Sequence, residues 1–182
     1  GMDGLEVLRR IRQAARDSET DTQVIIITGH GDMEMAVEAL DLDASDFINK
    51  PVERQALDSA LDRAEKRIRQ AGSDGFSVTD ELRNGCLSLT LSGRLTKDSE
   101  AELAEIIRRE TAKGELTAVT LDTDDCFSIN RSGIELLTRL IQGLISEEIP
   151  VVLENVSYNY ARVFQMTGLD KLARINEARG EE

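Results

Sequence analysis

The spacing of apolar residues predicts that helices and strands alternate across residues 1–71. Leu5, Leu8 and Ile11 recur at intervals of three and four, which predicts a helix with one buried face. The β-branched run Val24–Ile27 predicts a short strand buried on both faces. A second strand is predicted at 46–49. Two further helices are predicted from apolar residues at helical spacing. The first has Met33, Val37 and Leu40, and the second has Leu57, Ala60, Leu61, Ala64 and Ile68. This alternation predicts a parallel α/β layer.

From residue 76 onward, strands with one polar face are predicted. Residues Cys86–Leu91 alternate between apolar and polar, which is typical of a half-buried strand. The pair Asn84-Gly85 predicts a hairpin turn that joins this strand to residues 76–82. The remaining elements are predicted as a helix at 98–113, a strand at 116–122, a loop at 123–130, a helix at 131–146, a strand at 150–153, a helix at 157–167 and a short last element at 172–175.

Five small or turn-forming residues, Ala71–Gly75, divide the two patterns. The predicted domains are therefore a first domain at 1–71 that ends in a long helix, a linker at 72–75 and a second domain at 76–182.

Composition and charge narrow the classes of protein. Asp and Glu outnumber Lys and Arg by 35 to 22, which gives a formal net charge of −13. Nucleic acids and anionic membranes attract clustered positive charge, so neither is expected as a partner. The chain has no apolar run near the roughly 18 residues of a membrane span, and its arginine-bearing start at 1–16 is not expected to be a signal peptide. Because two cysteines are too few for a disulfide framework, we expect a cytoplasmic protein with reduced thiols.

Three separated motifs in the first half resemble a bacterial response-regulator receiver domain. They are Met2–Leu8, Ile25–Gly31 and Asp46–Pro51, and they follow one another in the order and spacing of that family. The resemblance implies that Thr28 and Lys50 stand where the family contacts a phosphoryl group, through charge-assisted hydrogen bonds. It also implies that Phe47 matches the aromatic residue whose rotamer reports phosphorylation, and that the Lys50-Pro51 bond is often cis in the family.

The resemblance covers only the later part of a receiver domain. The family's acidic metal pair and its phospho-accepting Asp lie on the first and third strands, and this chain begins after both. Thr28 and Lys50 are therefore expected to be remnants, and Mg²⁺ and a histidine kinase are expected only for a full-length receiver. A fragment and a natural truncation both remain open. Without the first three strands, the strand at 24–28 has an apolar edge, so we expect a homodimer through residues 1–70.

The second half resembles a STAS domain, the family of anti-sigma-factor antagonists. The motifs that carry this resemblance are Leu91–Leu95, Val119–Asp122, Phe127–Leu137 and Met166–Leu172. The family fold is a mixed sheet with helices mainly on one side. The expected fold class is thus α/β, a truncated receiver-like layer followed by a STAS-like sheet. The resemblance implies docking onto a partner such as an anti-sigma factor, a serine kinase or another signalling protein.

Many members of that family are switched by phosphorylation of a Ser at a helix N-terminus, and the loop Asn130–Gly133 matches this position. Arg131 stands where the family has its phospho-acceptor, and an arginine cannot accept phosphate in that way. Arg131 is expected either to supply a fixed positive charge for docking or to be simply solvated. Ser132 is either a phosphorylation site or, with Glu135, part of a capping box. The predicted docking residues are Asn130, Arg131, Ser132 and Gly133.

The sequence favours a non-enzymatic signalling adaptor, with a nucleotide- or lipid-sensing STAS module as the alternative. No nucleophile–base pair, metal cluster or Gly-rich phosphate loop is evident, so an enzyme is not expected, nor a cofactor. Other polar residues have ordinary interpretations. We expect a solvated loop rather than a cation site at Asp122, Asp124 and Asp125, a surface role for His30, and plain packing for Cys86 and Cys126.

Overall fold

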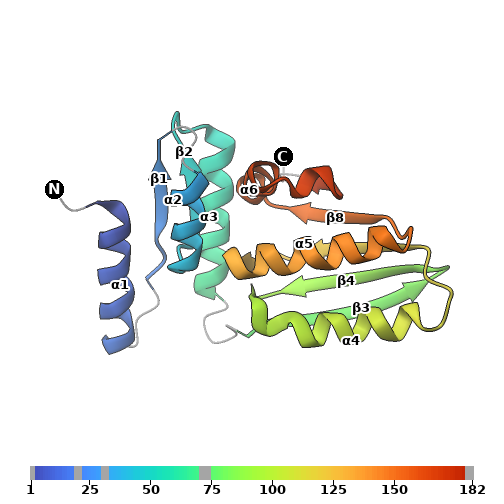
Figure 1. Ribbon diagram of the computed structural model, residues 1–182. Coiled ribbons are helices and arrows are strands. Elements are labelled where there is room, and N and C mark those ends of the chain that lie inside the picture. Colours follow the sequence, from blue (N-terminus) through green and yellow to red (C-terminus); the bar gives the residue numbers. More distant parts are fainter. Residues whose placement is uncertain (1–2, 19–21, 30–32, 70–74, 179–182) are drawn as a thin grey trace. The chain divides into compact units, whose positions relative to one another are not determined.

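A computed structural model describes residues 3–18, 22–29, 33–69 and 75–178 (Figure 1). The chain divides into two compact units, Gly1–Asp74 and Gly75–Glu182, and each is described by itself. Of the predicted linker at 72–75, only Gly75 lies within the described residues.

The first unit confirms the predicted alternation of helices and strands. Strands β1 and β2 pair in parallel, from Ile25 opposite Asp46 to Thr28 opposite Asn49. The elements in order are α1 (Gly4–Ser18), β1 (Ile25–Thr28), α2 (Met33–Asp41), β2 (Asp46–Asn49) and α3 (Arg54–Arg69).

Strand β1 is not buried on both faces, so that prediction is wrong. Ile26 and Thr28 are buried on one face, but the Ile27 side chain on the other face is 48% exposed. A strand is buried on both faces only where elements cover both sides. In the described part of the first unit, β1 has β2 as its one neighbouring strand. The first three residues of β2, by contrast, are all buried.

Helix α3 buries a narrower stripe than the sequence predicts. Ala56, Ala60 and Ala64 are buried, whereas the predicted stripe members Leu61 and Ile68 are 47% and 55% exposed. Helical residues three and four apart share a face, so a stripe can be wider than the surface that its helix covers.

One buried ion pair joins α3 to β2. The Nε of Arg63 lies 3.4 Å from Oδ2 of Asp46, and the two side chains are 7% and 0% exposed. The other carboxylate oxygen, Oδ1 of Asp46, accepts a hydrogen bond from the backbone N–H of Phe47 at 2.8 Å. Buried charges require such partners, since an isolated ion in the interior is strongly unfavourable.

The second unit is a five-stranded mixed sheet with the order β3-β4-β6-β8-β9. The β3–β4 pair is antiparallel and the other pairs are parallel. The elements in order are β3 (Ser77–Arg83), β4 (Cys86–Ser92), β5 (Arg94–Leu95), η1 (Lys97–Ser99), α4 (Glu100–Thr111), β6 (Ala118–Thr123), β7 (Ser128–Ile129), α5 (Arg131–Ser146), β8 (Val151–Val156), α6 (Tyr158–Thr167), η2 (Leu169–Lys171) and β9 (Arg174–Glu177).

The predicted hairpin is confirmed between β3 and β4. Asn84 and Gly85 both have positive φ, 50° and 80°, as a two-residue turn of this kind requires. A Cβ at Gly85 would lie 2.7 Å from the backbone oxygen of Glu115, so the close approach of another segment also requires glycine there.

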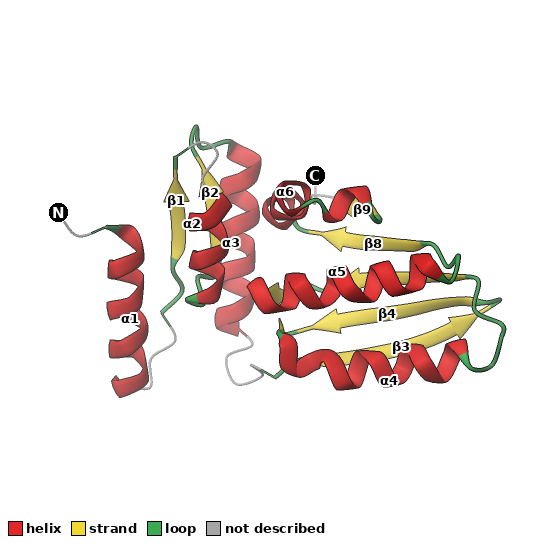
Figure 2. Ribbon diagram, viewed as in Figure 1, coloured by secondary structure: helices red, strands yellow, loops and turns green. Residues whose placement is uncertain are grey.

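Burial alternates along the central strands, which shows that one face of the sheet is covered. In β4 the side chains of Leu87, Leu89 and Leu91 are fully buried, and the residues between them are half-buried. Strand β6 has the same alternation. Helices α4 and α5 lie on one side of this sheet in Figure 2. The expectation of a mixed sheet with helices mainly on one side is confirmed.

The structure adds a short strand pair that the sequence analysis missed. Strands β5 and β7 pair in parallel, with Arg94 opposite Ser128 and Leu95 opposite Ile129. The segment 123–130, predicted as a loop, thus contains a strand. The last element, predicted at 172–175, lies later in the structure. The turn η2 ends at Lys171, and strand β9 begins at Arg174 and ends at Glu177.

Charged side chains tie α4 to β3. The Nη2 of Arg109 lies 2.5 Å from Oδ2 of Asp80, and its Nε lies 2.7 Å from Oε1 of Glu110. Hydrogen bonds from Lys113 and then from Arg109 lower the pKa of Glu110, because both stabilise the carboxylate. The hydrogen bond to Glu110 in turn raises the pKa of Arg109.

Candidate functional site

Of the three positions that match receiver motifs, Thr28 and Lys50 lie at the carboxyl ends of β1 and β2, and Phe47 lies near the start of β2. The backbone N–H of Lys50 donates a hydrogen bond to the carbonyl oxygen of Thr28 at 2.8 Å, which brings these two residues together. The Thr28 side chain is 4% exposed, and its hydroxyl lies 3.9 Å from Sδ of Met35. Phe47 is buried in the core at 1% exposed, whereas Lys50 is exposed. The Lys50-Pro51 peptide bond is cis.

In the second unit, the candidate docking residues form the first turn of α5. Helix α5 begins at Arg131, and its N-cap is Asn130, whose Oδ1 accepts a hydrogen bond from the N–H of Gly133 at 2.9 Å. An Asn at this position satisfies a donor that would otherwise be unpaired at the helix start. The predicted capping box at Ser132 and Glu135 is therefore wrong, since Ser132 already lies within the helix.

Ser132 instead bridges two segments that are distant in the sequence. Its hydroxyl donates to Oδ1 of Asn130 at 2.9 Å and accepts from the backbone N–H of Lys97 in η1 at 3.1 Å. Gly133 packs against the same segment, because a Cβ there would lie 2.3 Å from the backbone oxygen of Leu95. The first turn of α5 is thus held against β5 and η1.

Arg131 is exposed at the first position of α5. A positive side chain at a helix N-terminus opposes the helix dipole, an effect of about 0.3–1 kcal/mol at the surface. The charge of Arg131 is therefore not favourable for the dipole of α5 itself.

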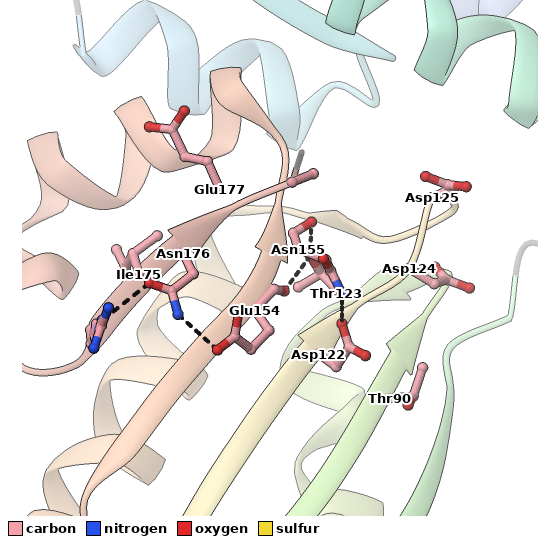
Figure 3. Close-up of a pocket in the computed structure, with 12 residues that line it drawn as sticks. Thr90, Asp122, Thr123, Asp124, Asp125, Glu154, Asn155, Ile175, Asn176 and Glu177 are labelled. Carbon is pink, nitrogen blue, oxygen red and sulfur yellow. Dashed lines mark hydrogen bonds between the residues drawn. The ribbon is translucent and has the colours of Figure 1, made fainter. Parts of the chain in front are cut away.

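A hollow of about 870 Å³ lies at the carboxyl ends of the sheet strands (Figure 3). Within it the Nδ2 of Asn155 donates to Oδ1 of Asp122 at 2.7 Å, and the Nδ2 of Asn176 donates to Oε1 of Glu154 at 2.7 Å. The charged residues that line it are Asp122, Asp124, Asp125, Glu154, Glu177 and Arg174. A lining with this excess of carboxylates repels anionic ligands.

Metal coordination needs ligands that converge on one point. Among the described residues, no group of three or more His, Cys, Asp or Glu side chains is placed to hold a metal ion. One oxygen of Asp124, its Oδ1, accepts a hydrogen bond from the backbone N–H of Cys126 at 2.9 Å.

The remaining residues that the sequence analysis singled out are two cysteines and one histidine. Cys86 lies at the start of β4, where its Sγ is 3.8 Å from the hydroxyl oxygen of Thr120. Neither of these two half-buried cysteines, Cys86 and Cys126, forms a disulfide. His30 lies outside the described residues.

Sequence reasoning found the first turn of α5 but missed the contribution of η1. No signal in the sequence pairs Lys97 with Ser132, which are 35 positions apart. The hollow was missed for the same reason, since β4, β6, β8 and β9 supply its lining from four separate segments.

Within the described residues, no helix is both long and apolar enough to cross a membrane.

Two family models match this chain. Residues 1–62 match the model described as response regulator receiver domain, and residues 77–181 match the model described as STAS domain. The transcriptional regulatory protein FixJ of Rhizobium meliloti (strain 1021) is 41% identical over 79 residues, which cover 43% of this chain and 37% of FixJ. The chain thus spans less than two fifths of the length of that relative.

Solved structures of anti-sigma factor antagonists are also similar to the second unit. One from Mycobacterium paratuberculosis has 20% sequence identity and a TM-score of 0.47, covering 58% of this chain and 88% of that chain. The Bacillus cell fate determinant SpoIIAA in its phosphorylated form has 20% identity and a TM-score of 0.44, covering 56% of this chain and 90% of that chain.

Proposed function

The chain belongs to the STAS domain family and carries a receiver-domain segment ahead of its STAS domain, and from this we propose a non-enzymatic signalling adaptor. Receiver and STAS domains are generally non-catalytic signalling modules. The proposed activity is docking of the STAS domain onto an anti-sigma factor, a serine kinase or another signalling protein. We propose that it acts in the cytoplasm, where the two thiols stay reduced.

The position of Arg131 is the observation that carries this proposal. The side chain is exposed on the first turn of α5, where its charge is unfavourable for the helix itself. Arginine is enriched among residues that dominate protein–protein binding. On a chain with a net charge of −13, a positive group at this surface offers complementary charge to an acidic side chain of a partner.

The alternative, a nucleotide- or lipid-sensing module, fits the structure less well. A ligand pocket for such a molecule needs groups that attract phosphate, such as Lys, Arg or clustered backbone N–H groups. The hollow in the described part of the second unit has five carboxylates in its lining and one arginine, Arg174. This charge favours protein docking over the binding of anions.

Docking without phosphorylation is the expected result for this site. When the chain is incubated with ATP and the serine-kinase anti-sigma factor of the same organism, mass spectrometry should show no stoichiometric phosphate, and calorimetry should show a complex. The change Arg131→Glu should weaken that complex about tenfold or more, because it places like charges together. Arg108→Glu, at an exposed arginine of α4, is the matched control and should bind as the unmodified chain does. Phosphate on Ser132 or Ser128, or equal binding by both variants, would contradict the proposal.

We also infer a homodimer through residues 1–70, in which β1 meets the β1 of a second copy in antiparallel orientation. The supporting observations are the edge position of β1 and the 48% exposure of Ile27. Light scattering on the chain is expected to give twice the monomer mass, and Ile27→Lys should yield the monomer. Ile145→Lys, at a residue of α5 that is 41% exposed, is the control and should remain dimeric. A monomeric unmodified chain would exclude this association.

The matches to receiver positions are proposed to be structural in this chain. The Thr28 hydroxyl is buried against Met35, so it is not exposed to a phosphoryl group from solvent. A histidine kinase as partner, and Mg²⁺ as its cofactor, are proposals for a full-length receiver only.

A further inference from the structure

We propose that the hydroxyl of Ser132 is a latch that holds η1 against the start of α5, so that the docking surface is built from both elements. This proposal rests on the function proposed above, since it concerns the same surface. It assigns Ser132 a positioning role and extends the surface to Lys97 and Asp98. These two residues are exposed and lie more than thirty positions before Arg131.

The hydrogen bonds of η1 show why a latch is needed. Inside the turn, the N–H of Asp98 donates to Oγ1 of Thr96 at 3.2 Å, and the N–H of Ser99 donates to the carbonyl oxygen of Thr96 at 3.1 Å. The N–H of Thr96 donates to Oγ of Ser99 at 3.3 Å. The turn therefore satisfies these three donors by itself. The N–H of Lys97, by contrast, donates to Ser132 across to α5 at 3.1 Å.

Ser132 is itself fixed from the other side. Its own proton is donated to Oδ1 of Asn130, the N-cap oxygen that also accepts from Gly133. This arrangement orients the lone pairs of the Ser132 oxygen toward Lys97, because a hydroxyl donates one hydrogen bond and accepts others. The cap of α5 and the backbone of η1 are thereby joined through a single side-chain oxygen.

The consequence is that the hydroxyl holds the first residue of η1, Lys97, without changing any charge. If it is removed, the N–H of Lys97 loses its acceptor, while the three hydrogen bonds inside η1 remain. The turn is then intact but no longer held at its first residue. An ion pair from Arg139 of α5 to Glu100, the first residue of α4, lies at 3.2 Å, but both side chains are exposed and it contributes little.

Amide hydrogen exchange on the full chain tests the latch without any partner. In Ser132→Ala the amide of Lys97 is expected to exchange roughly three- to tenfold faster, as the loss of one hydrogen bond implies. Ser132→Thr keeps a hydroxyl at the same place and should restore slow exchange. The matched control is Ser146→Ala, which removes a hydroxyl that donates to the carbonyl oxygen of Gly143 at the far end of α5, and should leave Lys97 unchanged.

The same variants separate this inference from the proposed function. With the serine-kinase anti-sigma factor as the probe, Ser132→Ala should weaken binding several-fold, and Ser132→Thr should bind as the unmodified chain does. Unchanged exchange at Lys97 in Ser132→Ala, or no rescue by Thr, overturns the latch whatever the partner does. If the amide of Lys97 exchanges faster in Ser132→Ala but this variant binds the partner fully, the proposal that η1 and α5 together form the docking surface is wrong. If the unmodified chain does not bind at all, the proposed function fails while the exchange result still decides the latch.

Discussion

Loss of the Asp46–Arg63 ion pair is expected to unfold the first unit while the second unit stays folded. Both side chains are almost fully buried, so either single change removes a buried ion pair and leaves a charge that this pair had compensated in the interior. Such changes cost about 3–5 kcal/mol, which is comparable to the whole stability of a small unit. The variants are Asp46→Asn and Arg63→Met.

Hydrogen exchange measured by mass spectrometry distinguishes the two units in one experiment. Peptides from β2 and α3 should lose protection in either variant, and peptides from β4 and β6 should keep it. The matched control is Arg54→Ala, which removes an ion pair to Asp58 whose side chains are 95% and 63% exposed. Such a pair contributes at most about 1 kcal/mol, so protection should be retained. Full protection of β2 and α3 in Asp46→Asn would show that the buried pair is dispensable.

Gly133→Ala is expected to destabilise the second unit, although alanine is the better helix former. The gain in helix propensity is about 1 kcal/mol. Against it, the new Cβ would lie 2.3 Å from the backbone oxygen of Leu95 and 2.8 Å from Cγ1 of Ile129. Neither the backbone of β5 nor the buried Ile129 can yield easily, and forced overpacking costs about 1–3 kcal/mol or more. We therefore expect a net loss of stability of up to about 2 kcal/mol.

Both tyrosines of the chain lie in α6, so tyrosine fluorescence during urea denaturation reports on the second unit alone. The control is Gly143→Ala in α5, the helix that also contains Gly133, because a Cβ at Gly143 would have nothing within 4 Å. This variant should be more stable by up to about 1 kcal/mol, since only the propensity changes. Opposite signs for the two substitutions are the expected result. A stabilised Gly133→Ala would mean that α5 does not pack closely on β5.

The local sequence pattern was sufficient to predict those elements whose conformation depends on residues next to them in the sequence. The helix at 131–146 and the strand at 46–49 have the bounds that the sequence predicts. The Asn84-Gly85 hairpin was also predictable, because two consecutive residues with positive φ require these residue types. Arg131 could be singled out because the motif around it fixes its place at a helix start.

The burial of β1 could not be predicted from the sequence, because a β-branched run occurs both at the edge and in the centre of a sheet. Ile25 to Ile27 have equal hydrophobicity, yet Ile26 is buried and Ile27 is half-exposed. The difference depends on which elements cover each face, and these come from other parts of the chain. The predicted burial of Leu61 and Ile68 on α3 is wrong for the same reason.

What the sequence determined by itself is the order of elements, the two family resemblances and the position of the candidate docking turn. Helix periodicity, turn residues and motif spacing are all properties of neighbouring positions, so they can be recognised without a fold. Only the tertiary structure decided that Asn130 rather than Ser132 caps α5, and that Ser132 binds Lys97. A hydroxyl can cap its own helix or bond to another segment with similar energy, and the choice depends on which backbone N–H the fold brings within hydrogen-bond distance of it.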